Sequence, residues 1–166
     1  IGQMDSTVSI RAVKGRKVGS AKTNSLDFDS LKRCLRKAEN IAEHQKEDPD
    51  FKGLPGPKEG RDGSAPYHKR TASYEPDQRA EKVKEIIQFA DDKGVDRVYG
   101  AFETSELGVL VANTKGVKRS DVLTKSNLTT TAIADWDNDQ GFGWGEACSA
   151  DVDQIDHMDV AKRAVD

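Results

Sequence analysis

The chain has 166 residues, of which 35% are hydrophobic and 33% charged, and its formal net charge is −3. A chain of this length can bury one sizeable core, so we expect a single domain over residues 1–166. Acidic and basic residues are scattered and neither sign forms a long block, so the charge gives no reason to expect contact with nucleic acid or a membrane surface. No apolar run reaches the ~18–20 residues of a membrane span.

Two cysteines, Cys34 and Cys148, lie in different predicted elements and match no metal-binding spacing. Reduced thiols that pack as small apolar groups are therefore the simplest interpretation. Free thiols are typical of proteins in a reducing compartment. We accordingly expect a cytoplasmic protein.

The first third of the chain predicts a hairpin followed by a helix. Residues 7–13 and 17–23 alternate apolar and polar side chains around a turn at Gly15-Arg16, which is typical of two half-buried strands. Asp27 is suited to cap a helix. The apolar residues after it recur at helical spacing: Leu31, Cys34, Leu35, Ala38, Ile41 and Ala42.

The remainder predicts a long connection, two more helices and several strands. Residues 48–75 are rich in proline and glycine and predict an irregular loop, after which a helix runs from Pro76 to Gly94. Residues 96–105 and 107–116 read as two strands around a turn near Glu106, and 117–136 as long β structure. A polar loop at 135–141, a strand at 141–149 and a last helix from about Asp156 complete the chain. This order predicts an α+β fold, a two-layer sandwich of a mainly antiparallel sheet with amphipathic helices on one side.

An acidic segment, "DWDNDQGFGWGE", has the ligand spacing of an EF-hand calcium loop. Asp135, Asp137 and Asp139 alternate, and Glu146 stands at the twelfth position. The sixth position of such a loop requires glycine, but here it is Gln140, and the flanking sequence is strand-like rather than helical. We therefore interpret these residues as the polar tip of a hairpin, with a weak cation site as the alternative.

The glycines of "GFGWG" alternate with aromatic residues inside a probable strand. A phosphate-binding loop needs glycines between a strand and a helix, and that order is absent. We interpret Gly141, Gly143 and Gly145 as positions where another backbone or ring approaches one face, with Phe142 and Trp144 packing on the other.

No catalytic or metal site follows from the three histidines. His44, His68 and His157 lie in three different predicted elements, and none has a serine or cysteine placed beside it by a motif. A zinc-protease helix needs two histidines on one face with a glutamate beside the first. The chain contains no such helix.

Four segments, taken in order, resemble the N-terminal domain of the TldD/PmbA family, which is also called modulator of DNA gyrase. They are "GSAKTNSLDFDSLKRCLRKAENIAE", "EDPDFKGLPGP", "VLVANTKGVKRS" and "GFGWGEACSADVDQIDHMDVAKRAVD". The resemblance extends from about Val8 to Asp166. Members are described as zinc metallopeptidases or their non-catalytic partners, implicated in peptide maturation, proteolysis of small proteins and gyrase modulation.

The resemblance implies a role for the chain within a larger protein. The zinc motif of the family, His-Glu-x-x-x-His, lies downstream of this domain and nothing here matches it, so we expect no cofactor and no peptidase activity in this chain. Family members also carry strand-forming sequence before the position of Ile1, so we expect an internal fragment. The expected function is a non-catalytic domain that helps to form the chamber for peptide substrates and the contacts with a related TldD/PmbA-type subunit, in a homo- or hetero-oligomer.

Two other functions stay open at this point. The parent protein is either the zinc metallopeptidase or the PmbA-type partner that lacks the zinc motif, and the sequence of the fragment does not separate them. A free-standing peptide- or calcium-binding module is the third possibility.

Overall fold

A computed structural model describes residues 2–57, 65–137 and 139–166 of the chain. The chain divides into two compact units, residues 1–55 and residues 56–166, where the sequence analysis expected one domain. The boundary between the units falls inside the connection predicted at 48–75. Each unit has its own buried cluster of apolar side chains.

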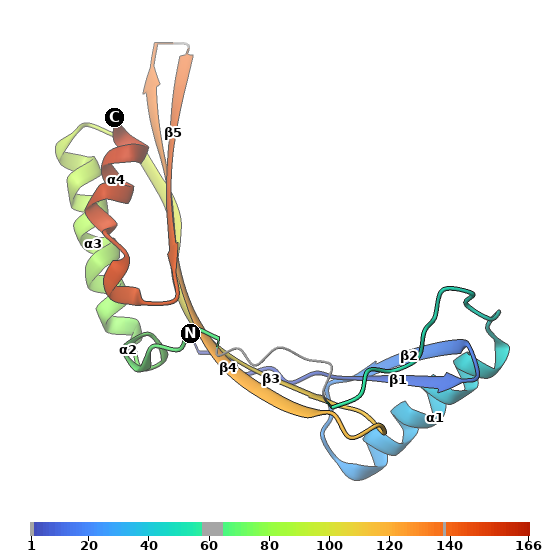
Figure 1. The fold of residues 1–166 in the computed structure, drawn as a ribbon. Coiled ribbons are helices and arrows are strands. Elements are labelled where there is room, and N and C mark those ends of the chain that lie inside the picture. The colour runs from blue at the N-terminus through green and yellow to red at the C-terminus, as the bar shows by residue number, and fades with distance from the viewer. Residues whose placement is uncertain (1, 58–64, 138) are drawn as a thin grey trace. The chain divides into compact units, whose positions relative to one another are not determined.

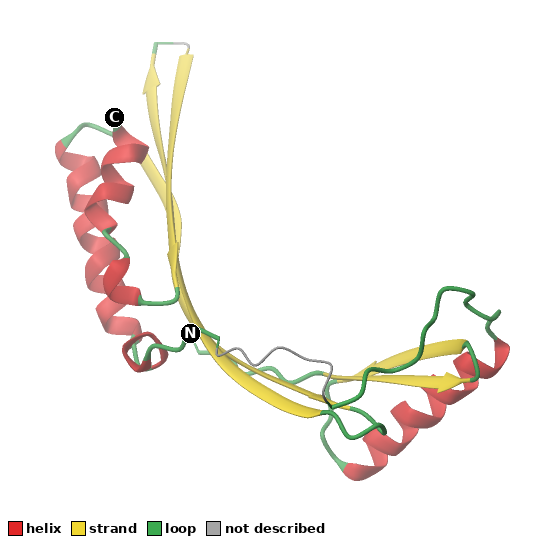
Figure 2. Ribbon diagram, in the orientation of Figure 1, coloured by secondary structure: helices red, strands yellow, loops and turns green. Residues whose placement is uncertain are grey.

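The first unit is a β-hairpin covered by one helix. Strands β1 (Val8–Lys14) and β2 (Lys17–Thr23) pair antiparallel, and α1 (Phe28–His44) packs against them (Figure 2). The core consists of the small side chains of Ala21, Cys34 and Ala38. At Gly19 a Cβ atom would lie 2.2 Å from the carbonyl oxygen of Ala38. The helix therefore rests directly on the backbone of β2.

A capping interaction begins α1 where the sequence predicted it. The Asp27 carboxylate accepts a hydrogen bond of 2.8 Å from the backbone N–H of Ser30 and one from the hydroxyl of Ser25. These bonds, led by that from Ser25, hold the pKa of the Asp27 carboxyl well below its usual range. The N-cap is thus a charged group in the folded protein.

The second unit is a three-stranded antiparallel sheet with helices on one face. Its strands β3 (Arg97–Ala112), β4 (Lys118–Trp136) and β5 (Asp139–Ser149) lie in the order β3-β4-β5. Helices α3 (Pro76–Asp92) and α4 (His157–Val165) lie side by side against this sheet (Figure 1). Two short helices, α2 (Lys69–Ala72) and η1 (Val152–Gln154), complete the unit.

Side chains of β4 alternate between the two faces of the sheet. Thr124, Ser126, Leu128, Thr130 and Ala132 are buried, and the residues between them are more accessible. Leu128 packs in a core with Ile86 of α3 and Val160 of α4. We call the side that carries Leu128 the helix face and the opposite side the open face.

Helix α4 contacts the backbone of β5 at the glycines of the "GFGWG" motif. A Cβ atom at Gly143 would lie 1.8 Å from the carbonyl oxygen of Ala164, and one at Gly145 would lie 2.2 Å from that of Val160. The Arg163 side chain also donates a 2.9 Å hydrogen bond to the carbonyl oxygen of Glu146. The alternation of glycine therefore marks a close approach of helix backbone, as the motif indicated.

The α+β class and the antiparallel sheet are confirmed, but two expectations about the strands are wrong. The turn expected near Glu106 does not exist, because β3 is one strand that pairs with β4 without interruption from Arg97 to Ala112. Most of the polar loop expected at 135–141 belongs to strands, since β4 ends at Trp136 and β5 begins at Asp139. Hydrogen bonding across the hairpin outweighs the polar character of this segment.

A short helix interrupts the connection that was expected to be irregular. The hydroxyl of Thr71 in α2 donates a 2.9 Å hydrogen bond to the carbonyl oxygen of Ala150 and accepts one of 2.8 Å from the N–H of Val152. Thr71 is buried. These contacts link residues about 80 positions apart in the sequence, so local propensity does not reveal the helix.

We predict that Asp27→Asn removes part of the acid sensitivity of the protein. The carboxyl pKa is depressed by folding, so its stabilising contribution is present above the unfolded value of 3.8 and lost as pH falls below it. Asparagine also caps helices but does not titrate. Urea unfolding between pH 6 and pH 2 should show the difference between variant and wild type shrinking on the acid side, and Asp29→Asn serves as the control. A constant difference over this range contradicts the prediction.

We predict that Gly143→Ala destabilises the protein by roughly 1–3 kcal/mol, because the added methyl group collides with the backbone of α4. Gly2→Ala is the control, since a Cβ atom at Gly2 has nothing within 4 Å. Urea-induced unfolding followed by circular dichroism measures both. Equal midpoints for the two variants would show that α4 does not rest on β5.

Candidate functional site

The three aspartates of the acidic segment lie together at the tip of the β4–β5 hairpin. Asp135 is opposite Gln140, and Trp136 is opposite Asp139. Asp137 has a positive φ of 50°, which suits a short polar residue in a tight turn. The hairpin tip predicted for these residues is therefore present.

Asp135 already has partners of its own. Its carboxylate pairs with the Arg97 guanidinium at 2.5 Å and accepts a hydrogen bond from the side-chain amide of Gln140. These interactions, the Gln140 hydrogen bond first, lower the pKa of the Asp135 carboxyl. Arg97 thus neutralises the carboxylate that a cation would need.

Glu146 does not join the aspartates. It lies on β5 opposite Thr129, seven positions beyond Asp139, so about 3.4 Å per residue places it roughly 24 Å along the strand. Among residues 2–57, 65–137 and 139–166, no three His, Cys, Asp or Glu side chains are grouped so that they could hold a metal ion. In the sequence four residues have the spacing of calcium ligands: Asp135, Asp137, Asp139 and Glu146. The chain forms a strand hairpin here instead of a calcium-binding loop, so this spacing does not bring the four side chains together.

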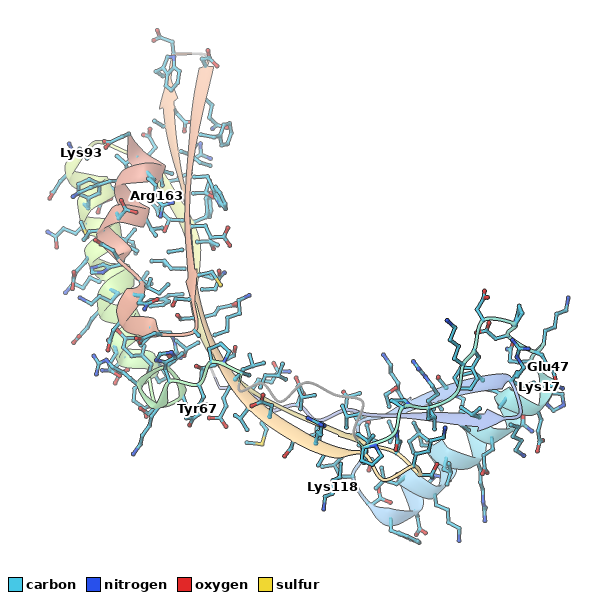
Figure 3. All side chains as sticks on the ribbon, in the orientation of Figure 1. Lys17, Glu47, Tyr67, Lys93, Lys118 and Arg163 are labelled. Carbon is cyan, nitrogen blue, oxygen red and sulfur yellow. The ribbon has the colours of Figure 1, made fainter. Side chains whose placement is uncertain are left out.

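The open face carries a cluster of exposed aromatic side chains. Phe142 lies opposite Ile133, and Trp144 is opposite Thr131, which in turn is opposite Tyr99. Phe142, Trp144 and Tyr99 are 67%, 59% and 55% exposed, while Ile133 between them is buried. Figure 3 shows side chains projecting from the β3-β4-β5 sheet on the side away from α4. Here the sequence analysis is wrong: it expected the aromatics of "GFGWG" to pack, and they face solvent.

The open face becomes polar further along the strands. Glu146 lies opposite Thr129, and the next row joins Cys148, Asn127 and Glu103. Cys148 is an exposed free thiol. The face therefore combines an aromatic area near the hairpin tip with two carboxylates beside it. This arrangement can bind an extended chain that carries apolar and basic side chains.

A cavity of about 320 Å³ between α3 and the sheet is a weaker candidate. Its lining includes Val83, Ile86 and Ile87 of α3 and Val98 and Gly100 of β3. None of its lining residues is charged. The polar side chains of its lining are Tyr99, Thr129 and Thr130, and no charged group is present to fix the orientation of a ligand.

Family models match both units of the chain. The model described as the PmbA/TldA metallopeptidase central domain matches residues 69–166, more than half of the chain, and the model described as PmbA/TldA metallopeptidase domain 1 matches residues 3–42. The chain belongs to the TldD/PmbA family. Each TldD/PmbA domain model falls within one of the two compact units, and the resemblance of the four sequence segments is confirmed.

Solved structures of other proteins share the fold. TldE from Thermococcus kodakarensis matches with a TM-score of 0.81 and 20% identity, over 96% of this chain and 36% of that chain. A proposed modulator of DNA gyrase from Thermotoga maritima matches with a TM-score of 0.77 and 21% identity, over 96% and 36%. A similarly described protein from Bacteroides thetaiotaomicron matches with a TM-score of 0.79 and 16% identity, over 94% and 37%.

At these identities the likeness shows the fold alone. This TldD/PmbA chain spans little more than a third of the length of those three proteins. A comparison with curated proteins found no match. No helix in the described part of the chain is long and apolar enough to cross a lipid bilayer.

The residues present do not fit the zinc ion that the family name implies. His44 bonds the carbonyl oxygen of Asn40 within α1, His68 lies 3.5 Å from Asp151, and His157 contacts Glu85 at 2.6 Å. These three pairs belong to different elements, and within residues 2–57, 65–137 and 139–166 none has a third ligand beside it. No step of a reaction is assigned to zinc in this chain.

The open aromatic face is the feature that sequence analysis missed. Tyr99 lies more than 40 residues before Phe142 in the sequence, and only strand register brings the two segments into one sheet. The available signal was the period of two in "GFGWG", which places both aromatics on the side away from the glycines. The same period does not say whether that side is covered.

We predict that millimolar calcium leaves the melting temperature of the protein unchanged. The Asp135 carboxylate is paired with Arg97, and Glu146 is too far along β5 to complete a ligand set. Thermal unfolding with calcium and with chelator tests this. A rise of several degrees that Asp137→Ala abolishes would establish a calcium site at the hairpin tip.

Proposed function

We propose that this chain is a non-catalytic part of a TldD/PmbA-type metallopeptidase system that acts on peptides or small proteins. In this proposal the open face of β3-β4-β5 forms a wall of the substrate chamber and contacts the substrate. The observation that carries it is the exposed group of Tyr99, Phe142 and Trp144 on a sheet whose other face is closed by helices. Exposed aromatic groups of this kind mark binding surfaces.

The chemistry of the face favours an extended peptide as the bound molecule. Phe142 and Trp144 point the same way from alternate positions of a strand, and an extended chain presents its own side chains with that period. Glu103 and Glu146 beside the aromatics would select basic residues in the peptide. Peptide maturation and proteolysis of small proteins are both reactions that require such contacts.

The zinc, the peptidase residues and the partner belong to other parts of the system in this proposal. The chain contains no His-Glu-x-x-x-His sequence, which fits either a metallopeptidase parent with zinc elsewhere or a PmbA-type partner subunit. We propose a TldD/PmbA-type subunit, either a second copy of this chain or a related one, as the protein partner. Both cysteines are free thiols, which supports a cytoplasmic location.

Gyrase modulation has less support than peptide binding. The relative from Thermotoga maritima is described as a proposed modulator of a DNA gyrase, but charged residues of this chain are balanced and scattered. A protein that binds DNA directly needs a concentrated positive surface. Any effect on gyrase would therefore act through a protein or peptide.

We predict that Trp144→Ala weakens binding of an unstructured peptide by about tenfold, a loss typical of an exposed aromatic anchor. The probe is a fluorescein-labelled peptide with apolar and lysine residues at alternate positions, followed by fluorescence anisotropy. Phe28→Ala is the matched control, because Phe28 is an exposed aromatic residue on α1 in the other unit.

Equal affinity of the Trp144→Ala and Phe28→Ala proteins would contradict the proposed role of the open face. The same samples test the absence of catalysis. The wild-type chain should leave the peptide intact over a long incubation with added zinc. Cleavage that a chelator stops would show that the chain carries a peptidase site of its own.

A further inference from the structure

The outer edge of β3 has no partner strand among the described residues. The strand order β3-β4-β5 puts β3 at one side of the sheet. Beyond Ser126 the sheet narrows further, because β5 pairs with β4 only between Ser126 and Trp136. The remaining part, residues 106–124, is a two-stranded ribbon, and such a ribbon is at best marginally stable in water.

The ribbon is apolar along its β3 strand. Residues 107–112 read "LGVLVA", with no charged residue and no proline. Leu107, Leu110 and Val111 are 52%, 67% and 57% exposed. Natural edge strands are usually protected by lysine, proline or a bulge, and this segment has neither a lysine nor a proline. An uncharged apolar edge of this kind is a template for pairing with another strand.

The other edge of the ribbon is already covered. The N–H of Ala65 donates to the Asp121 carboxylate at 2.8 Å, and the N–H of Thr124 donates to the carbonyl oxygen of Pro66 at 3.1 Å. The segment before α2 thus lies along β4 where β5 ends. Among the described residues, the β3 edge is therefore the edge of the ribbon that is available for pairing.

The hairpin tip defines which backbone groups of β3 point outward. The N–H of Asn113 donates to the carbonyl oxygen of Val117 at 3.0 Å. The N–H of Gly116 donates to the carbonyl oxygen of Asn113 at 3.2 Å. Because hydrogen-bonded pairs alternate along an antiparallel ladder, Val111 and Val109 also point their backbone groups toward β4. Gly108, Leu110 and Ala112 therefore direct their N–H and C=O groups away from the sheet.

We propose that this edge pairs with the same edge of a second copy of the chain, antiparallel, about a two-fold axis at Val109. In this register Val109 faces its own copy, Leu107 faces Val111, and the outward groups of Gly108 bond those of Leu110. Every contact between 107 and 111 then joins apolar residues or glycine. Shifting the axis to Gly108 sets Glu106 against Leu110, and shifting it to Leu110 sets Leu107 against Asn113, whereas the axis at Val109 sets Glu106 against the smaller side chain of Ala112.

The β3 edge would supply the subunit contact of the proposed function, and in that respect this inference rests on the proposed function. The residues involved lie at the far end of the sheet from Trp144, which is in register with Thr131 rather than with 118–124. A variant can therefore lose peptide binding and keep dimerisation, or the reverse, so the two proposals are tested separately. Two-fold pairing is the symmetry expected for a self-complementary edge.

A register-specific cross-link tests the axis. Val109→Cys in a Cys148→Ser background places the new thiol opposite its own copy, in a non-hydrogen-bonded pair with Cα atoms about 4.5 Å apart, which suits a disulfide. Val111→Cys in the same background is the matched control, since its two copies would be about 14 Å apart along the strands. Mild oxidation should give covalent dimer for Val109→Cys and monomer for Val111→Cys.

Sedimentation of folded variants tests the edge itself. Wild type should show a concentration-dependent dimer. Leu110→Pro removes only an outward N–H and should abolish the dimer, as should Leu110→Lys. Val122→Lys adds the same charge on the same side of the ribbon but on β4, where Val122 is opposite Gly108. It should dimerise within threefold of wild type, and circular dichroism checks that each variant is folded.

Four outcomes would overturn the proposal. Wild type could be monomeric at high concentration, with no cross-link at Val109→Cys. The dimer could persist in Leu110→Pro with unchanged affinity, which would place the contact elsewhere. Cross-linking could favour Val111→Cys over Val109→Cys, which would exclude the axis at Val109. A monomer that instead binds a related family subunit through Leu110 would replace the second copy by that partner.

Discussion

The contact between the backbone of α4 and the backbone of β5 is the constraint on which the second unit depends. Without side chains at Gly143 and Gly145, the carbonyl oxygens of Ala164 and Val160 occupy the space where Cβ atoms would stand. Helix and sheet then bury Leu128 and Val160 almost completely between them. Loss of either glycine would separate the layers, because a packed interior has no room to absorb an added methyl group.

This close contact also decides what the two faces of the sheet can do. A strand has a period of two, so the glycines that admit α4 force Phe142 and Trp144 onto the opposite side. Tyr99 joins them there through its register with β4. The alternation of glycine and aromatic residues in β5 therefore sets the properties of both faces. The glycines allow α4 to pack on one face, and the aromatic side chains lie on the other. In our proposals the aromatic face and the β3 edge serve different partners.

Local chemistry made several elements predictable from the sequence. Asp27 and Asp156 cap their helices with hydrogen bonds to backbone N–H groups two or three residues later, and Pro76 stands at the start of α3. Such signals act within one turn of helix. Prediction failed where the deciding contact was distant. β3 continues through Glu106 because β4 offers a partner along its whole length, and α2 forms because Thr71 bonds Ala150 and Val152.

The acidic segment shows where the division between sequence and structure lies. By itself the sequence determined the α+β class, the helix ends, the polar hairpin tip and the family, because each rests on short-range periodicity or on an ordered set of segments. Only the tertiary structure decided that Arg97 pairs with Asp135, that Glu146 lies far from Asp139, and that the described residues leave the aromatic face and the β3 edge uncovered. Exposure is a property of what packs against a residue, and strand register over tens of residues sets it.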